Sequence, residues 1–269
     1  MGGNLTTKEN DLIKLNFLGL SISVFDRGEL ISTLMNNVIE NKKKIYYGYS
    51  IGEIAYIKKH AEIYKYGQKS DIFVTDGRIF YLLARKHGLN LKYDISIPNL
   101  VLLVLELANK NHWSVFLLGS KEETNEAAQR RIKSLYPQIE KISGQNGYFN
   151  ENELSKIFAH LKDNKYNIVL IGTSSPQKEK LAVEIRDQAD VNIIIPCGGM
   201  IDVLAGVTKL TPLWAKKYGI ASFYRLLQEP RRLFKRYLFI YSYLIFSFFP
   251  KYLYFVVLKK NKNYSIIDE

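Results

Sequence analysis

Through roughly the first 215 residues, short apolar runs alternate with longer stretches of helical periodicity. Five runs rich in β-branched residues predict strands over 45–49, 72–74, 114–118, 168–171 and 191–195. The stretches between them predict helices over 26–40, 78–87, 100–109, 122–136, 151–161 and 176–188. Each strand is continuously apolar, which is typical of strands buried on both faces. The pattern therefore predicts an α/β fold with a mostly parallel sheet flanked by helices.

Three of the predicted strands end in small residues directly before a helix. Gly119 and Ser120 follow the third strand, residues 172–175 follow the fourth, and residues 196–200 follow the fifth. Ligands of open parallel sheets bind at the carboxyl ends of the strands. Small residues there let the backbone approach a phosphate, and a helix N-terminus favours the negative charge. The three junctions together predict a nucleotide-binding site.

The chain lacks the motifs of several common nucleotide and metal enzymes. It has no G-x-G-x-x-G fingerprint, no G-x-x-x-x-G-K-[ST] phosphate loop and no Asp-x-Asp pair. Its four histidines show no ligand spacing with one another or with the single cysteine, Cys197. We therefore predict no catalytic metal and no cofactor. The lone cysteine fits a reducing cytosol, and the polar residues 1–10 predict no secretory signal.

Positive charge is concentrated in the last fifth of the chain. Residues 216–269 carry eleven Lys and Arg against three Asp and Glu, so +8 of the formal net charge of +12 lies there. The same segment is rich in Phe, Tyr, Leu and Ile, which indicates an anionic membrane surface as partner rather than nucleic acid. We therefore predict a catalytic domain over 1–215 and a basic, aromatic, helical membrane-associating appendage over 216–269.

Residues 237–258 are almost wholly apolar apart from Pro250 and Lys251. This stretch of 22 residues is close to the roughly 20 that cross a bilayer. A lysine near the middle of a lone spanning helix costs about 3 kcal/mol, however. We therefore predict two short interfacial or re-entrant helices rather than a span. Burial against the catalytic domain or a partner subunit is the third alternative.

A carboxylate at the end of the second predicted strand is the candidate for chemistry. Asp76 comes directly before a predicted helix, and Gly77 beside it leaves room for a substrate. Asp76 either caps that helix or serves as a general base, because glycosyl transfer needs an ionised carboxylate within reach of an acceptor hydroxyl.

Six ordered strings carry a resemblance that runs from about Leu15 to Tyr237: TDG at 75–77, VFLLG at 115–119, GQNGYF at 144–149, GTSSPQKEK at 172–180, GGMIDVLAG at 198–206 and FYRLLQEPRRLFKRY at 223–237. In these strings the chain resembles the WecG/TagA/CpsF family of bacterial glycosyltransferases. The resemblance implies a Rossmann-like core and an inverting hexosyltransferase that needs no metal. It implies transfer of an N-acetylmannosamine-like or related sugar from a UDP-sugar to an undecaprenyl-diphosphate-linked sugar. Such enzymes act in cell-surface polysaccharide or teichoic acid assembly, peripherally attached to the cytoplasmic face of the membrane.

The resemblance also implies roles for individual residues. Asp76 occupies the position of the proposed catalytic base, and Arg225 and Arg232 occupy those proposed to hold the diphosphate of the lipid acceptor. Arg231, Lys235 and Arg236 lie beside the two arginines as helpers. The other substrate-binding candidates fall within the matching strings: Gly77, Gly119, Ser174, Lys178, Glu179, Gly198, Gly199 and Asp202.

The chain departs from the family pattern at three places. Relatives usually have Thr followed by Asn after the first predicted strand, where this chain has Gly48, Tyr49 and Ser50. Asp94 replaces an arginine, and Lys178 replaces a neutral glutamine. An exchange of charge between Asp94 and Lys178 within one pocket would indicate a different donor sugar or acceptor. A nucleotide-cofactor oxidoreductase and a non-catalytic membrane adaptor remain as alternatives, and the sequence leaves a homo-oligomer open.

Overall fold

The computed structural model describes residues 12–259, 261, 264–265 and 267. Residues 1–10, from which no secretory signal is predicted, lie outside the described residues. So do four charged residues of the basic segment, Lys260, Lys262, Asp268 and Glu269.

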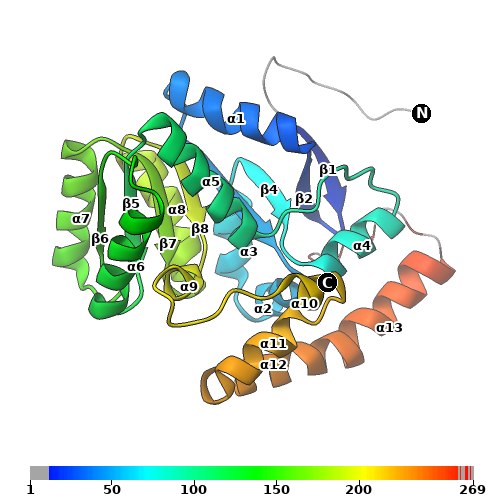
Figure 1. Ribbon diagram of the computed structural model, residues 1–269. Helices are drawn as coiled ribbons and strands as arrows, with labels where there is room; N and C mark the ends of the chain where they lie inside the picture. The colour runs from blue at the N-terminus through cyan, green and yellow to red at the C-terminus, as the bar shows by residue number, and fades with distance from the viewer. Residues whose placement is uncertain (1–11, 260, 262–263, 266, 268–269) are drawn as a thin grey trace.

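A sheet of six parallel strands forms the centre of the molecule, in the order β4-β3-β8-β7-β5-β6 (Figure 1). The strands are β3 (Lys44–Tyr49), β4 (Ile72–Thr75), β5 (Val115–Gly119), β6 (Ile142–Gln145), β7 (Tyr166–Gly172) and β8 (Val191–Pro196). All five predicted strands are present, so the predicted α/β fold with a parallel sheet is confirmed.

Three strands were not predicted from the hydrophobic pattern. β6 is a half-buried edge strand with the sequence ISGQ, which has one large apolar residue. β1 (Ile13–Phe17) and β2 (Leu20–Val24) form a separate antiparallel hairpin, joined at Leu18 and Gly19 with φ of 57° and 88°. The hairpin lies beside β4, where the Ser23 hydroxyl accepts a hydrogen bond from the Phe73 N–H at 2.9 Å.

The six predicted helices are also present, with ends that differ by up to three residues. They are α1 (Arg27–Ile39), α4 (Arg78–Lys86), α5 (Ile97–Asn111), α6 (Glu122–Leu135), α7 (Glu151–Asp163) and α8 (Gln177–Gln188). Short helices fill several of the remaining connections: α2 (Ile51–Lys59), α3 (Ala61–Gly67), α9 (Met200–Leu204), α10 (Leu213–Lys217) and α11 (Ala221–Gln228).

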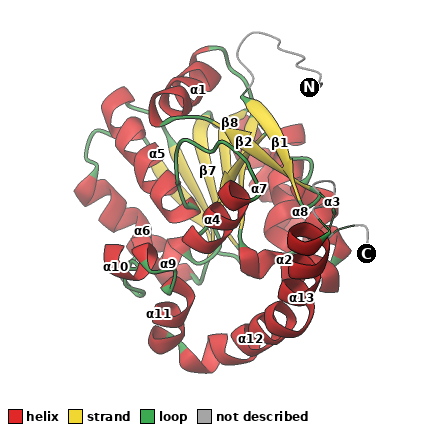
Figure 2. Ribbon diagram, turned by 90° about the vertical axis from the view of Figure 1, so that its right-hand side faces the viewer, coloured by secondary structure: helices red, strands yellow, loops and turns green. Residues whose placement is uncertain are grey.

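Successive strand residues face opposite sides of the sheet, and helices cover both sides (Figures 1 and 2). In β3, Tyr46 lies in the cluster formed with α1 and α5, whereas Tyr47 lies in the cluster formed with α2, α3 and α4. Ile45 lies in a third cluster with α7 and α8, on the same side as Tyr47. The sheet is therefore buried on both faces, as its continuous hydrophobicity predicts.

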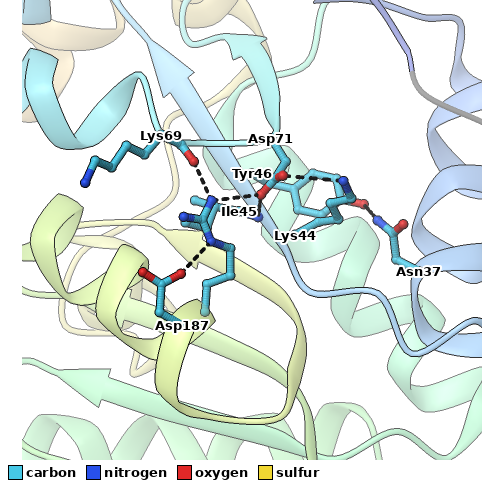
Figure 3. Close-up of polar contacts among 8 residues, drawn as sticks. Asn37, Lys44, Ile45, Tyr46, Lys69, Asp71 and Asp187 are labelled. Atoms are coloured by element: carbon cyan, nitrogen blue, oxygen red, sulfur yellow. Dashed lines mark hydrogen bonds and ion pairs between the residues drawn. The ribbon is translucent and has the colours of Figure 1, made fainter. Parts of the chain in front are cut away.

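An ion-pair network closes the amino ends of β3 and β4, the end opposite Asp76 (Figure 3). One oxygen of Asp71 accepts a hydrogen bond from the Ile45 N–H at 2.9 Å, and its other oxygen lies 3.4 Å from Lys44 Nζ. Arg186 reaches Asp71 at 3.6 Å and donates to the Lys69 carbonyl at 2.5 Å. These contacts join α8 to the start of two strands and leave the carboxyl ends of the sheet for the site.

The C-terminal part is a continuous helical run from Pro230 to Leu258. It consists of α12 (Pro230–Tyr243), a π-helical segment η1 (Leu244–Phe248), α13 (Phe249–Lys251) and a second π-helical segment η2 (Tyr252–Leu258). The prediction of two short helices separated at Pro250 is therefore wrong. Pro250 lies inside this continuous run, two residues after η1 and two before η2. Proline removes one hydrogen bond from a helix interior, and the run has π-helical geometry on both sides of that point.

One side of this run packs on the core and the other is exposed. Ile240, Leu244, Phe248 and Tyr252 lie in the hydrophobic cluster that contains Phe80 of α4. Burial against the catalytic domain, the third alternative from the sequence, is thus present along one side. By length and composition, this run is the one helix of the described residues that could cross a membrane.

Candidate active site

Asp76 lies at the carboxyl end of β4, between the sheet and the start of α5. Its backbone N–H donates to the Tyr49 carbonyl at 2.8 Å, and its carboxylate accepts from the Ile97 N–H at 3.0 Å. Burial raises the pKa of Asp76 above its ordinary value, and the Ile97 N–H, Lys178, Arg225 and Lys216 oppose that rise. Gly77 is at the cap position before α4. The Asp76 carboxylate accepts instead from the first N–H of α5, whose own cap residue Ser96 forms no side-chain cap bond. Asp76 therefore binds the start of α5, and its role as a general base stays a prediction.

Gly48, the first departure from the family pattern, has a local structural reason. A Cβ atom at this position would lie 2.5 Å from Ile97 Cγ1 and 3.0 Å from Asp76 Cβ. Close packing of Ile97 against β3 places the Ile97 N–H on the Asp76 carboxylate. A threonine here would force these groups apart, so Gly48 and Ile97 fit each other.

Lys178 belongs to a buried group of charges beside Asp76. Its ammonium lies 2.9 Å from Glu179 Oε1 and 3.6 Å from Glu53 Oε1. The Tyr47 hydroxyl lies 2.5 Å from the same Glu53 oxygen, and the Ser175 hydroxyl donates to Glu179 at 2.8 Å. Burial disfavours the Lys178 ammonium, but Glu53 and Glu179 outweigh it, and the pKa of Lys178 is raised. For Glu53, burial dominates and raises the pKa of the carboxyl.

The other exchanged residue, Asp94, pairs elsewhere. Its carboxylate lies 2.9 Å from Arg78 Nη1, at the start of α4. Asp94 and Lys178 thus form separate ion pairs, one with Arg78 and one with two glutamates. Each exchanged charge is neutralised by its own partners, so the two departures do not compensate each other by contact.

The glycine loops meet at the point where β5 and β7 lie side by side. A Cβ atom on Gly119 would lie 2.5 Å from the carbonyl carbon of Gly172, and one on Gly147 would lie 3.1 Å from Gly119 Cα. The connections from β5 and β7 lead to opposite sides, towards β6 and β8, which makes this a topological switch point. The hydroxyl of Thr173, a buried side chain, has no hydrogen-bond partner among the described residues. The geometry fits a ligand held by the main chain.

Two arginines from the C-terminal helices converge on the loop after β8. Arg225 Nη2 lies 2.8 Å and Arg232 Nη2 3.9 Å from the position of a Cβ atom on Gly199. Arg225 is half-buried, and no carboxylate among the described residues forms an ion pair with it. Gly199 and the two arginines thus lie together, although they are more than 25 positions apart in the sequence. Their role in substrate binding stays a prediction, as does that of Gly198.

The remaining candidates are distributed around this centre. The Asp202 carboxylate, in α9, accepts a hydrogen bond from the Ser120 hydroxyl at the end of β5. Ser174 is exposed in the loop after β7, and its carbonyl accepts from the Lys178 N–H at 3.0 Å. The Arg236 guanidinium lies over the Tyr56 ring, 5.1 Å from its centre. Arg231 is exposed and forms no ion pair with any part of the chain that the structure describes.

Two residues near Asp76 were not singled out from the sequence. Lys216 lies close enough to favour the ionised carboxylate of Asp76, and it donates to Asn99 Oδ1 at 2.7 Å. Burial lowers the pKa of Lys216, and Asp76 opposes that change. Glu53 is the other, and its helix α2 has no motif in the family strings. Lys216 belongs to the basic C-terminal segment, but only the fold shows that it lies beside Asp76.

No group of three or more His, Cys, Asp and Glu side chains within the described residues is arranged to hold a metal ion. Metal independence stays a prediction.

Comparison with known proteins agrees with this site. The model of the glycosyl transferase WecG/TagA/CpsF family matches residues 15–254. Proteins of Staphylococcus aureus strains MW2 and NCTC 8325 are 26% identical over 242 residues, 85% of this chain and 91% of the relative. The protein of strain MRSA252 is 25% identical over the same extent. All three are named N-acetylglucosaminyldiphosphoundecaprenol N-acetyl-beta-D-mannosaminyltransferase. The family match covers most of the chain and includes Asp76, the glycine loops and both arginines, so the oxidoreductase alternative is set aside and the chain belongs to the WecG/TagA/CpsF family of glycosyltransferases.

Proposed function

We propose that this enzyme transfers a sugar, N-acetylmannosamine or a related one, from a UDP-sugar to an undecaprenyl-diphosphate-linked sugar. The product serves cell-surface polysaccharide or teichoic acid assembly at the cytoplasmic face of the membrane. The names of the S. aureus relatives identify the first substrates to test: an N-acetylmannosamine donor and N-acetylglucosaminyl-diphosphoundecaprenol as acceptor.

One observation carries the proposal. The guanidinium of Arg225, which has no ion pair among the described residues, lies against Gly199 and near enough to Asp76 to favour its ionised carboxylate. A transferase with a lipid diphosphate acceptor needs two kinds of group in one place: a carboxylate that takes the proton of the acceptor hydroxyl, and fixed cations that bind the diphosphate. Arginine suits this role because its planar fork binds phosphate oxygens in pairs.

The chemistry follows from direct displacement at the anomeric carbon. The Asp76 carboxylate takes the proton of the acceptor hydroxyl as the oxygen attacks the sugar, and the bond to the UDP oxygen breaks. The electron pair leaves with UDP, and the anomeric configuration inverts. Cationic side chains stabilise the leaving diphosphate, with no metal required by this scheme.

The exposed side of the C-terminal helices supports attachment to the membrane. Large apolar side chains stay exposed on α10, α11 and the run that follows, among them Leu213, Trp214, Phe223, Leu227, Phe234, Leu238, Ile245, Phe246 and Leu253. Arg231, Lys235 and Arg236 lie next to them in sequence. Apolar area flanked by cations is typical of surfaces that bind anionic lipid. We therefore place the protein peripherally on the cytoplasmic membrane face.

The test is a transfer assay with the full chain in membranes. A panel of UDP-sugars is offered with several lipid-diphosphate-linked sugars, and products are identified by mass, with and without EDTA. We expect one donor–acceptor pair to give the mass of one added sugar and free UDP, with the rate unchanged by EDTA. The anomeric configuration of the product is read by NMR, and its retention would contradict the displacement scheme. No transfer with any pair would favour a non-catalytic adaptor.

A further inference from the structure

The break between α11 and α12 contains a carboxylate that the transfer scheme does not use. Glu229 separates the two helices: its N–H donates to the Arg225 carbonyl at 3.1 Å, and its carbonyl accepts from the Leu233 N–H at 3.0 Å. The break brings Arg225, in the last turn of α11, and Arg232, in the first turn of α12, to the same loop.

The two oxygens of Glu229 have different partners. Oε2 accepts from Arg232 Nε at 2.5 Å, and Oε1 accepts from the Thr208 hydroxyl at 3.3 Å. Thr208 is buried, and its backbone N–H donates to the Asp202 carbonyl at 3.2 Å. The carboxylate is therefore fixed from α9 on one side and holds Arg232 on the other.

The position of Arg232 requires such a partner. A cation in the first turn of a helix lies at the positive end of the helix dipole and is disfavoured there. The Arg232 side chain is 55% exposed, so solvent competes for it. Glu229 compensates the dipole with a negative charge and binds through Nε. The two terminal nitrogens remain directed away from Glu229, one of them towards Gly199.

We propose that Glu229 is a positioning residue, which holds the Arg232 guanidinium so that its terminal nitrogens face the diphosphate of the lipid acceptor. The inference rests on the proposed function. It assigns Glu229 no contact with either substrate, and Thr208 acts through Glu229.

The opposite role for Glu229 gives the opposite result. If its charge only neutralised Arg232, Glu229→Gln would free the cation and strengthen binding of the anionic acceptor. If Glu229 positions Arg232, the same substitution weakens that binding.

The experiment compares Glu229→Gln, Arg232→Ala and the double variant in the full chain. We expect Glu229→Gln to raise KM for the acceptor about tenfold and to leave KM for the donor unchanged. In the Arg232→Ala background, Glu229→Gln should add nothing, because the side chain that it positions is gone. Gln228→Ala is the matched control: the Gln228 side chain forms hydrogen bonds with the backbone of Lys209, and its removal should leave both KM values unchanged.

A lower acceptor KM, an equal change in both KM values, or full additivity with Arg232→Ala would overturn the proposal. Binding of inorganic pyrophosphate in the presence of saturating UDP gives a readout without turnover. Glu229→Gln and Arg232→Ala should weaken it equally, and an unchanged affinity in Glu229→Gln would overturn the proposal. If the wild type transfers no sugar at all, the proposed function fails, while the pyrophosphate result still decides the role of Glu229.

Discussion

Arg225 approaches Gly199 so closely that no side chain fits between them: Nη2 lies 2.8 Å from where a Cβ atom would be. The Gly199 backbone has φ of −69° and ψ of 16°, which an alanine adopts without strain. Gly199 is therefore needed for the arginine, not for the turn.

Gly199→Ala tests this relationship directly. Apart from the neighbouring residues in the chain, the three described atoms nearest to the new methyl group belong to Arg225 and Arg232, and the guanidinium of Arg225 must move because it would lie at 2.8 Å. We expect a loss of transfer of roughly tenfold, the equivalent of about 1.4 kcal/mol, or one charge-assisted hydrogen bond. The melting temperature should stay within about 2 °C of wild type. Full activity would show that the approach of Arg225 to this loop has no role in catalysis.

Asp76→Asn separates activity from stability. Removing the base should lower kcat by about 10²–10⁴-fold. Burial raises the pKa of Asp76, so the folded state holds the proton more tightly than the unfolded chain. The ionised carboxylate therefore costs stability at any pH above the ordinary aspartate pKa of about 3.9.

Asp76→Asn should accordingly melt at a higher temperature than wild type at pH 7. The difference should vanish below the ordinary aspartate pKa, where both states are protonated. The acid limb of the wild-type kcat profile should lie above that pKa as well. An active Asp76→Asn variant would rule out Asp76 as the base, and a variant less stable than wild type at pH 7 would rule out the stability cost of the ionised carboxylate.

Lys178→Gln restores the neutral residue that the family pattern expects, and we expect it to destabilise this chain. It leaves Glu53 and Glu179 close together, with side chains 12% and 0% exposed, and removes the ammonium that pairs with both. Removing one partner of a buried ion pair costs about 3–5 kcal/mol. Glu53→Gln in the same chain should recover much of that loss. Chemical denaturation of Lys178→Gln, Glu53→Gln and the double variant measures the free energy of unfolding. Additive losses would show that Lys178 and Glu53 do not interact.

Phe246 and Phe248 form a matched pair on the C-terminal run, 81% and 0% exposed. Phe246→Asp should abolish flotation with vesicles of anionic lipid and leave the melting temperature unchanged. Phe248→Asp should destabilise the fold by about 3 kcal/mol or more, because it places a carboxylate in the core. Vesicle binding that survives the Phe246 substitution would place the lipid contact elsewhere.

The sequence predicts the sheet and the main helices well, because short, continuously apolar runs indicate buried strands and the longer stretches between them have helical periodicity. It does not predict β6, since an edge strand with the sequence ISGQ carries no such signal. The pattern also suggests a break at Pro250, but packing of Leu244, Phe248 and Tyr252 on the core maintains the helical run through it. Tertiary contacts outweigh the local preference there.

For the site, motif strings identify Asp76, the glycine loops and the arginines, because each lies at a strand end or in a distinctive string. Three-dimensional partners are not accessible in this way. Nothing in the sequence pairs Lys178 with Glu53 of α2, Asp94 with Arg78, or Arg232 with Glu229 against the loop of Gly199. Only the fold brings these residues together.

The contact between Gly119 and Gly172 has a consequence for how the sugar preference of such an enzyme can change. At this point the floor of the site is main chain, which presents the same amide groups whatever the surrounding sequence. Substitution of either glycine would damage the floor without altering its chemistry. Altered sugar preference, by drift or by design, must therefore arise from side chains near that floor, and Lys178, in the helix that follows β7, is the position at which to begin.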